Sequence, residues 1–347
     1  MSWSCKLCTI GFLKFRRKSM KKRKGLVFLI TVVLLLILLL FAINTGSIKV
    51  SLKELYDGLF VAYDPNVTAI FDLRFPRICI ALIGGAAMAV AGVLLQAVMK
   101  NPLADPGIIG ISSGASLAAV LVSAFFPSWY FVTPIIAFLG GLLAFFLVYS
   151  LSYKEGLSPL RIILVGVAVN AMFTGIMAAF NSGTGSTYAG AASIVNANIT
   201  MKTWSDVITL AIYTTLGFIA SCFVLNSCNL LALEDKTVRS LGIHVNHLRF
   251  VVSMIAVLLA SIATAIIGPI GFLGLIVPHI ARLLVGSNHK VLVPYCILLG
   301  AFTLLFADTL GRVIAPPYEI SASIIMSVIG GPFFIFLLRG SKNTYGQ

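Results

Sequence analysis

Residues 74–114, RFPRICIALIGGAAMAVAGVLLQAVMKNPLADPGIIGISSG, decide how this chain folds. The stretch joins a charged entrance, an apolar run and a turn that contains two prolines. A hydrocarbon core about 30 Å thick requires about 20 apolar residues in helical conformation. The stretch therefore predicts a transmembrane helix, a rigid turn and the start of a second helix, in a protein that handles something crossing a membrane.

The composition of the whole chain places it outside the soluble globular class. Of its 347 residues, 59% are hydrophobic and 10% are charged, and the mean hydropathy is +1.04. A chain of this kind needs lipid as its solvent. Because the segments of about ten alternating residues that build a barrel are absent, and backbone groups in lipid must be satisfied internally, we predict an all-α polytopic membrane protein.

Apolar runs between charged or turn-rich breaks predict about ten transmembrane helices. The eighth run is the least regular, because Pro269 and Pro278 interrupt it and suggest a broken or re-entrant helix. The predicted spans are 26–43, 78–98, 107–126, 131–150, 160–180, 206–226, 249–268, 270–286, 292–311 and 320–338.

The basic residues predict the orientation. Placing the N-terminus in the cytosol puts 19 of the 25 Lys and Arg residues on the cytosolic side, as the positive-inside rule requires. This gives a basic cytosolic segment (1–25), a membrane domain (26–340) and a cytosolic tail (341–347). The net charge of +14 is explained by these topology signals and by lipid contact. Nucleic-acid binding is not expected, because the cations are scattered at span ends.

The N-terminal segment carries two further signals. Met20 is followed by KKRK and would make a conventional start, so residues 1–19 are expected to be a disordered extension or to lie upstream of the true start. No cleavage site follows the first span, which predicts an uncleaved anchor. Cys5 and Cys8 have the spacing of half a zinc site but lack a second pair, so no metal site is expected.

Few ionisable residues fall inside or beside the spans. Asp308 and Arg312 stand four apart on one helix face, which fits mutual pairing or docking of a partner equally well. Glu319 precedes the last span, where the helix dipole favours an acid. Snorkelling toward the cytosol accounts for Arg282.

Three segments are more polar or more broken than a plain span requires. Residues 101–107, NPLADPG, form a compact turn that suggests a gate or a docking edge. Residues 234–249 form the only sizeable polar cytosolic insertion, and the spacing of Val238, Leu241 and Val245 predicts an apolar stripe that caps the bundle or seats a soluble partner. Glycines and prolines in residues 268–282 would break the seventh and eighth helices.

The chain resembles the permease subunit of ATP-binding cassette importers for iron-siderophores, haem and cobalamin. The segment AASIVNANITMKTW (191–204) departs from that family, which usually has a Trp and a Gly-Ser there beside the pathway. The resemblance covers roughly residues 26–340 and rests on RFPR (74–77), GVLLQ (92–96), NPLADPGIIG (101–110), RSLG (239–242), GPIGFLGLIVPHIAR (268–282), ADTLGR (307–312), EI (319–320) and IGGPFF (329–334).

The resemblance implies a type II importer architecture of ten helices per subunit, with two permease subunits enclosing the path in the plasma membrane of a bacterium. It implies partners for each end: an extracellular substrate-binding protein and a cytosolic ATPase dimer. It also implies three sets of site residues. These are docking arginines (Arg74, Arg77 and Arg312), an inner gate (Asn101 and Leu103) and ATPase-coupling residues (Glu234, Arg239, Ser240, Leu241 and Gly242).

No GxxxxGK[ST] loop occurs in the sequence, so the chain is expected to use ATP hydrolysed by a partner and to hold no cofactor of its own. The expected function is import of a ferric siderophore or haem, with cobalamin as the alternative. An ion-coupled transporter usually needs acids near the middle of the membrane, and none is expected there. An intramembrane serine protease is suggested by Gly110, Ser112 and Gly114, which fit GxSxG, but that motif requires a preceding strand.

Overall fold

The computed structural model describes residues 3–45, 51–60, 64–152, 159–184, 189–316 and 318–340. Within these ranges the chain is helical and contains no strand. The elements are α1 Trp3–Asn44, α2 Leu52–Phe60, α3 Pro65–Met99, α4 Ile111–Phe125, a 3-10 turn Pro127–Trp129, α5 Thr133–Ser152, α6 Pro159–Thr184, α7 Ala189–Val195, α8 Trp204–Leu231, α9 Asp235–Ser240, α10 Val245–Ile267, α11 Leu273–Val285, α12 His289–Ile314 and α13 Ala322–Gly340.

Each of the ten predicted spans corresponds to one helix, which confirms the predicted fold class. Seven helices in the described part of the chain are long and apolar enough to cross a membrane, and α4, α11 and α13 are shorter apolar helices. The irregular eighth span is α11, which has 13 residues and begins only after the break at residues 268–272. Helix α1 begins at Trp3, within residues 1–19, for which the sequence predicts a disordered extension or a position upstream of the true start.

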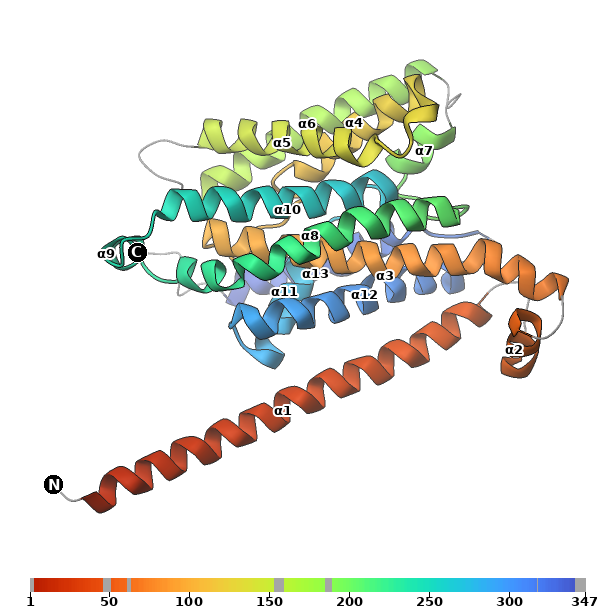
Figure 1. Cartoon of the computed structure of the whole chain (residues 1–347). Helices are drawn as coiled ribbons and strands as arrows, with labels where there is room; N and C mark the ends of the chain where they lie inside the picture. The colour runs from red at the N-terminus through yellow and green to blue at the C-terminus, as the bar shows by residue number, and fades with distance from the viewer. Residues whose placement is uncertain are drawn as a thin grey trace.

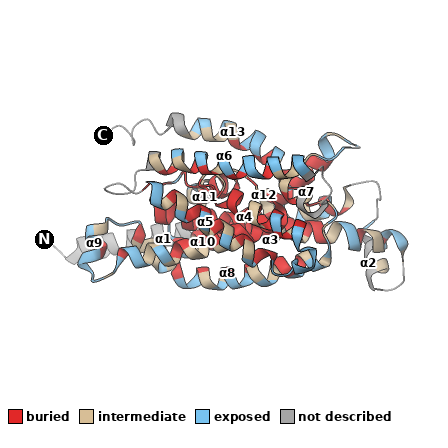
Figure 2. Ribbon diagram, turned by 90° about the horizontal axis from the view of Figure 1, so that it is seen from above, coloured by how far each residue is buried: buried red, intermediate tan, exposed pale blue. Residues whose placement is uncertain are grey.

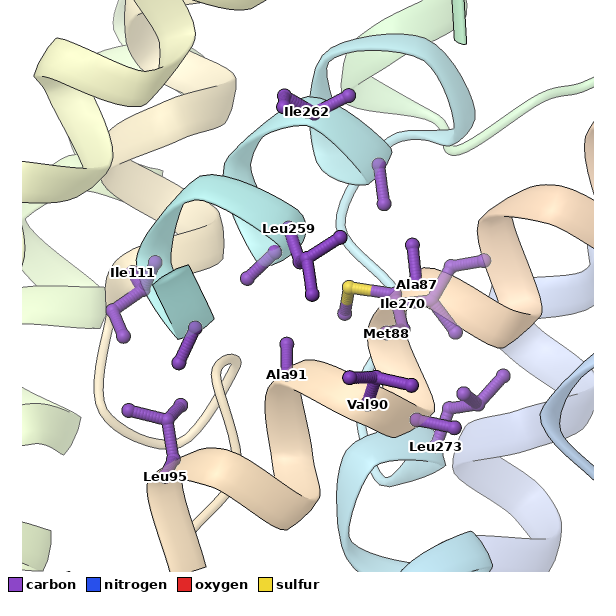
Figure 3. Packing of buried hydrophobic residues seen from close by; sticks show 14 of the residues in the cluster. Ala87, Met88, Val90, Ala91, Leu95, Ile111, Leu259, Ile262, Ile270 and Leu273 are labelled. Carbon is purple, nitrogen blue, oxygen red and sulfur yellow. The ribbon is translucent and has the colours of Figure 1, made fainter. Parts of the chain in front are cut away.

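Helix α3 is the central element of the bundle, and α8, α10, α11 and α12 pack around it. Figure 3 shows Met88 of α3 beside Leu259 of α10, Val90 beside Leu273 of α11, and Leu95 beside Ile111 of α4. Gly85 allows α12 to approach closely, because a Cβ there would lie 2.4 Å from the carbonyl oxygen of Gly300 on α12. The crossing of α3 and α12 therefore requires glycine on both helices.

A second layer contains α4, α5, α6 and α7, with α10 between it and α3. Buried residues gather along α3, α4, α10 and α11, while the outward faces of α6, α8 and α13 are exposed (Figure 2). Helix α9 and the start of α1 lie at one end of the molecule, and α2 and α7 lie at the other (Figure 1). We call these the α9 end and the α2 end.

Candidate functional site

A buried ion-pair cluster lies toward the α2 end, where α3 and α12 run side by side. Arg77 of α3 is 7% exposed. Its Nε and Nη2 donate to Oδ1 of Asp308 at 3.0 and 2.9 Å, and its Nη1 donates to Oε2 of Glu319 at 2.7 Å. Nε of Arg312 lies 3.4 Å from Oδ2 of Asp308. Two cations and two anions thus neutralise one another; Arg77, Asp308 and Arg312 are buried, whereas Glu319 is exposed.

Glu319 connects this cluster to a cavity of about 610 Å³. Its Oε2 also accepts a hydrogen bond from Oγ1 of Thr200 at 2.9 Å. Although partial burial opposes ionisation, hydrogen bonding and charge pairing with Arg77 hold the pKa of Glu319 below its usual value. The cavity is walled by Val195 at the end of α7 and the segment 196–200 that follows it, by Pro269, and by residues 319–324 before and in α13. The assignment of Glu319 to the helix dipole alone therefore misses its partner on α3.

The other two predicted docking arginines hold the end of α1. Nη1 of Arg74 donates to the carbonyl oxygen of Ile43 at 2.7 Å, and Nη2 of Arg312 donates to the carbonyl oxygen of Ala42 at 3.2 Å. The last carbonyl groups of a helix lack partners within it and attract cations. Arg74 and Arg312 therefore cap the C-terminus of α1, a structural role that the sequence analysis did not foresee.

The docking role of the three arginines stays a prediction, but the structure changes how it is tested. Charge reversal at Arg77 would break the buried cluster, so only Arg74 can be reversed without that damage. We expect Arg74→Glu to slow association with a binding protein about tenfold at low salt, because charges near an interface act mainly on the association rate. Lys53→Glu is the matched control, since Lys53 is an exposed cation on α2 at the same end. Equal association rates for Arg74→Glu and wild type would contradict docking at this residue.

The predicted inner gate lies at the α9 end, in the turn between α3 and α4. Asn101 and Leu103 are both buried. Oδ1 of Asn101 accepts a hydrogen bond from the amide of Leu103 at 2.9 Å, and its backbone carbonyl accepts one from the amide of Ala104 at 3.2 Å. These bonds fix the conformation of the turn, which fits a segment that closes a path. Its role as a gate is not tested by this geometry.

Gln96 joins this turn to α11, a role that the sequence analysis missed. Its Nε2 donates to the carbonyl oxygens of Ala104 at 3.3 Å and Gly274 at 3.2 Å, and its Oε1 accepts a hydrogen bond from Nη1 of Arg282. Arg282 therefore points into the bundle instead of snorkelling. The available signal for Gln96 was a polar side chain in the otherwise apolar run 78–99 of α3.

Asp105 is fully buried between the gate turn and the start of α11. Its Oδ1 accepts hydrogen bonds from the amides of Gly107 at 2.8 Å and Ile108 at 3.3 Å, and the backbone amides of Gly274 and Leu275 also face the carboxylate and lower its pKa. Burial raises the pKa of Asp105 to about 6 despite nearby backbone amides. The residue lines a cavity of about 410 Å³, together with Ser112, Ser113 and residues of α6.

The raised pKa of Asp105 predicts a pH dependence of stability. The folded state disfavours the ionised carboxylate, so its ionisation lowers the free energy of unfolding. This loss of stability is absent below the pKa of Asp105 in the unfolded chain, grows as the pH rises toward 6 and is complete above pH 6. Ionising Asp105 in the folded state therefore lowers the free energy of unfolding by roughly 3 kcal/mol. We expect the unfolding temperature in detergent to fall between pH 5 and pH 7.5, and Asp105→Asn to remove that fall. An unchanged pH profile in Asp105→Asn would contradict the assignment.

The predicted coupling residues form an exposed surface at the α9 end. The predicted apolar stripe is divided: Val238 and Val245 are buried, whereas Leu241 is 61% exposed. A separate cavity of about 390 Å³ lies beside Arg239 and residues 242–246. This surface presents one large apolar side chain ringed by polar groups, as a docking site for a soluble partner does. The other coupling residues, Glu234, Arg239, Ser240 and Gly242, are all exposed.

The geometry gives little support to the two alternatives, an intramembrane serine protease and an ion-coupled transporter. Ser112 is the second residue of α4 and follows a turn, so the strand that a nucleophile elbow requires is missing from this described segment. His279, a conceivable base for such a serine but distant from it in the sequence, packs edge-on against Phe333. Asp105 and Asp308 are both buried, Asp105 in the turn between α3 and α4 and Asp308 in the cluster toward the α2 end. Asp308 is neutralised by Arg77, which leaves it poorly suited to carry a coupling ion.

Comparison with known proteins places the chain among transport proteins. It is 41% identical over 324 residues to the "Probable heme-iron transport system permease protein IsdF" of Staphylococcus aureus strain Newman, covering 93% of this chain and 98% of that protein. A solved structure described as an inward-facing conformation of a metal-chelate type ABC transporter matches with a TM-score of 0.74 and 29% identity, covering 91% of this chain and 99% of that one.

A more distant structure, PsaBC from Streptococcus pneumoniae in complex with Fab, shares the fold with a TM-score of 0.54 and 17% identity, covering 82% of this chain and 95% of that one. The FecCD transport family matches residues 34–340, which include every helix from α2 to α13 and the second part of α1. The chain is therefore a multi-pass membrane permease that belongs to the FecCD transport family.

Proposed function

We propose that the chain is the permease subunit of an ATP-driven importer for an iron chelate, either haem or a ferric siderophore. The observation that carries the proposal is the exposed coupling surface around α9 at one end of a ten-helix bundle whose other end holds a polar cavity. A permease of this kind needs both features: an entrance for substrate and a surface on which a partner acts.

We assign one proposed partner to each end of the helix bundle. At the α2 end, an extracellular substrate-binding protein delivers the chelate to the cavity beside Glu319. At the α9 end, a cytosolic ATPase dimer hydrolyses ATP, so this chain holds no cofactor. A second permease subunit, identical or paralogous, completes the path. ATP binding shifts the bundle between outward-open and inward-open populations by contacts that differ between the two states.

The proposed orientation places both termini and α9 in the cytosol. Single cysteines at Asn66 and Asn198, which are exposed at the α2 end, are expected to react with an impermeant thiol reagent added outside intact cells. A cysteine at Asn246, exposed beside α9, is expected to react only after the membrane is opened. Labelling of Asn246→Cys in intact cells would contradict this orientation.

The substrate class is supported by the 41% identical relative from Staphylococcus aureus, which is named a heme-iron transport system permease protein. The test is growth of a strain lacking this permease on a single iron source, either haem or a ferric siderophore, with the wild-type gene restored on a plasmid. We expect restoration to rescue growth on one of the two iron sources. Rescue on neither, together with restored uptake of radiolabelled cobalamin, would assign the chain to corrinoid import instead.

A further inference from the structure

Three charged residues connect the start of α9 to the end of α3 and to α10. Nζ of Lys100 donates to Oδ1 of Asp235 at 2.7 Å and to the backbone carbonyl oxygen of Leu233. Nη2 of Arg249 on α10 donates to both carboxylate oxygens of Asp235, at 3.0 and 2.9 Å. Asp235 thus has one cationic partner on each of two different helices.

The backbone of Lys100 is held in an unusual conformation. Lys100 follows the last residue of α3 and has a φ of +49°, in the left-handed region. A residue with a Cβ adopts this region at a free-energy cost, so surrounding contacts must hold it there. The side-chain bonds to Leu233 and Asp235 supply such contacts. Lys100 therefore fixes the direction in which the chain leaves α3.

The predicted gate begins at the next residue. The amide of Asn101 donates to the carbonyl oxygen of Gln96 at 3.2 Å, and Oδ1 of Asn101 accepts a hydrogen bond from Leu103. No residue separates Lys100 from this hydrogen-bonded turn. A displacement of Asp235 would therefore reach the gate through Lys100 without passing through a flexible segment.

Stability alone does not account for this arrangement. The side chains of Lys100 and Asp235 are 34% and 33% exposed, and ion pairs with that much solvent access contribute only about 0–1 kcal/mol. Hydrogen bonding from Lys100 is the main reason that the pKa of Asp235 lies below its usual value. The carboxylate is therefore ionised, and the contact persists, at neutral pH.

We propose that Lys100 is a positioning residue that transmits movement of α9 to the inner gate through its ion pair with Asp235. The inference rests on the proposed function, because it assumes that an ATPase moves α9. Arg249 serves a different purpose: it holds Asp235 to α10, which packs against α9. Loss of Lys100 should disconnect the gate from α9, whereas loss of Arg249 should leave the connection in place.

The test uses the permease assembled with its ATPase in inside-out vesicles, with all native cysteines replaced and Ala104→Cys as a reporter in the gate turn. Ala104 is buried, so its maleimide labelling rate reports opening of the turn. In the parent protein we expect ATP with vanadate to change that rate on the order of tenfold. Lys100→Met should abolish the change, and Lys100→Arg should restore most of it.

Arg249→Met is the matched control, because it removes the other cation from the same carboxylate and should retain the nucleotide response. A full response in Lys100→Met, or an equal loss in Arg249→Met, would overturn the role of Lys100. Failure of the parent protein to bind an ATPase or to respond to nucleotide would instead overturn the proposed function, and the inference with it. The two failures are distinguished by the behaviour of the parent protein.

Discussion

Replacing Asp308 by Asn is expected to destabilise the folded protein by about 3–5 kcal/mol, because it leaves Arg77 and Arg312 buried without their shared counter-ion. Arg77 is 7% exposed and Asp308 is 1% exposed, so water cannot substitute for the lost carboxylate. The Asn side chain keeps one acceptor oxygen, but its NH2 group can only donate and so cannot pair with a guanidinium. The measurement is the unfolding transition of the purified protein in detergent.

Glu319→Gln is the control for this variant. Glu319 contacts the same guanidinium, but its side chain is 42% exposed, and we expect its loss to cost no more than about 1 kcal/mol. The double variant Arg77→Met with Asp308→Asn should be less destabilised than the sum of the single variants, because the residues interact directly. An Asp308→Asn protein as stable as wild type would contradict the claim that the ion-pair cluster stabilises the fold.

Replacing Leu241 by Asp is expected to abolish uptake and to release the ATPase, while the permease itself stays folded. The side chain of Leu241 is exposed, so the charge is tolerated in the free subunit. In an interface with a partner, an unpaired carboxylate opposes binding by several kcal/mol. Co-purification of a tagged ATPase, together with the unfolding temperature of the permease, measures both effects.

Val238→Asp is the matched control, since it places the same charge three residues away on a buried position of α9. This variant should lower the stability or the yield of the permease itself. A Leu241→Asp protein that co-purifies with its ATPase at wild-type yield and transports normally would contradict the role of this surface. Equal destabilisation by the two variants would also contradict it.

The helices could be predicted from the sequence because their signal is local. A run of apolar residues long enough to cross a bilayer identifies a helix from a single window of sequence. The break before α11 was also visible, since Gly268 and Pro269 interrupt an apolar run. The polar insertion at 234–249 stood out for the same reason, and its residues predicted for coupling are exposed.

The contacts between helices could not be predicted in the same way. Arg77 meets Asp308 and Glu319 across 231 and 242 residues, and no periodicity within one helix encodes such a pairing. Arg77 was therefore predicted only as a docking arginine, from the resemblance, and its burial was not predicted. The prediction of an apolar stripe of Val238, Leu241 and Val245 was wrong for a related reason. Helix α9 ends at Ser240, so helical spacing does not extend to Leu241, and the turn there rotates Leu241 away from the bundle.

The most direct test of the central claim is uptake of iron-labelled chelate into proteoliposomes that contain this permease, its ATPase and its binding protein. With ATP enclosed on the ATPase side and no ion gradient, we expect accumulation of haem or of a ferric siderophore that stops when ATP or the binding protein is omitted. Accumulation that is indifferent to ATP but follows an imposed proton or sodium gradient would contradict the account.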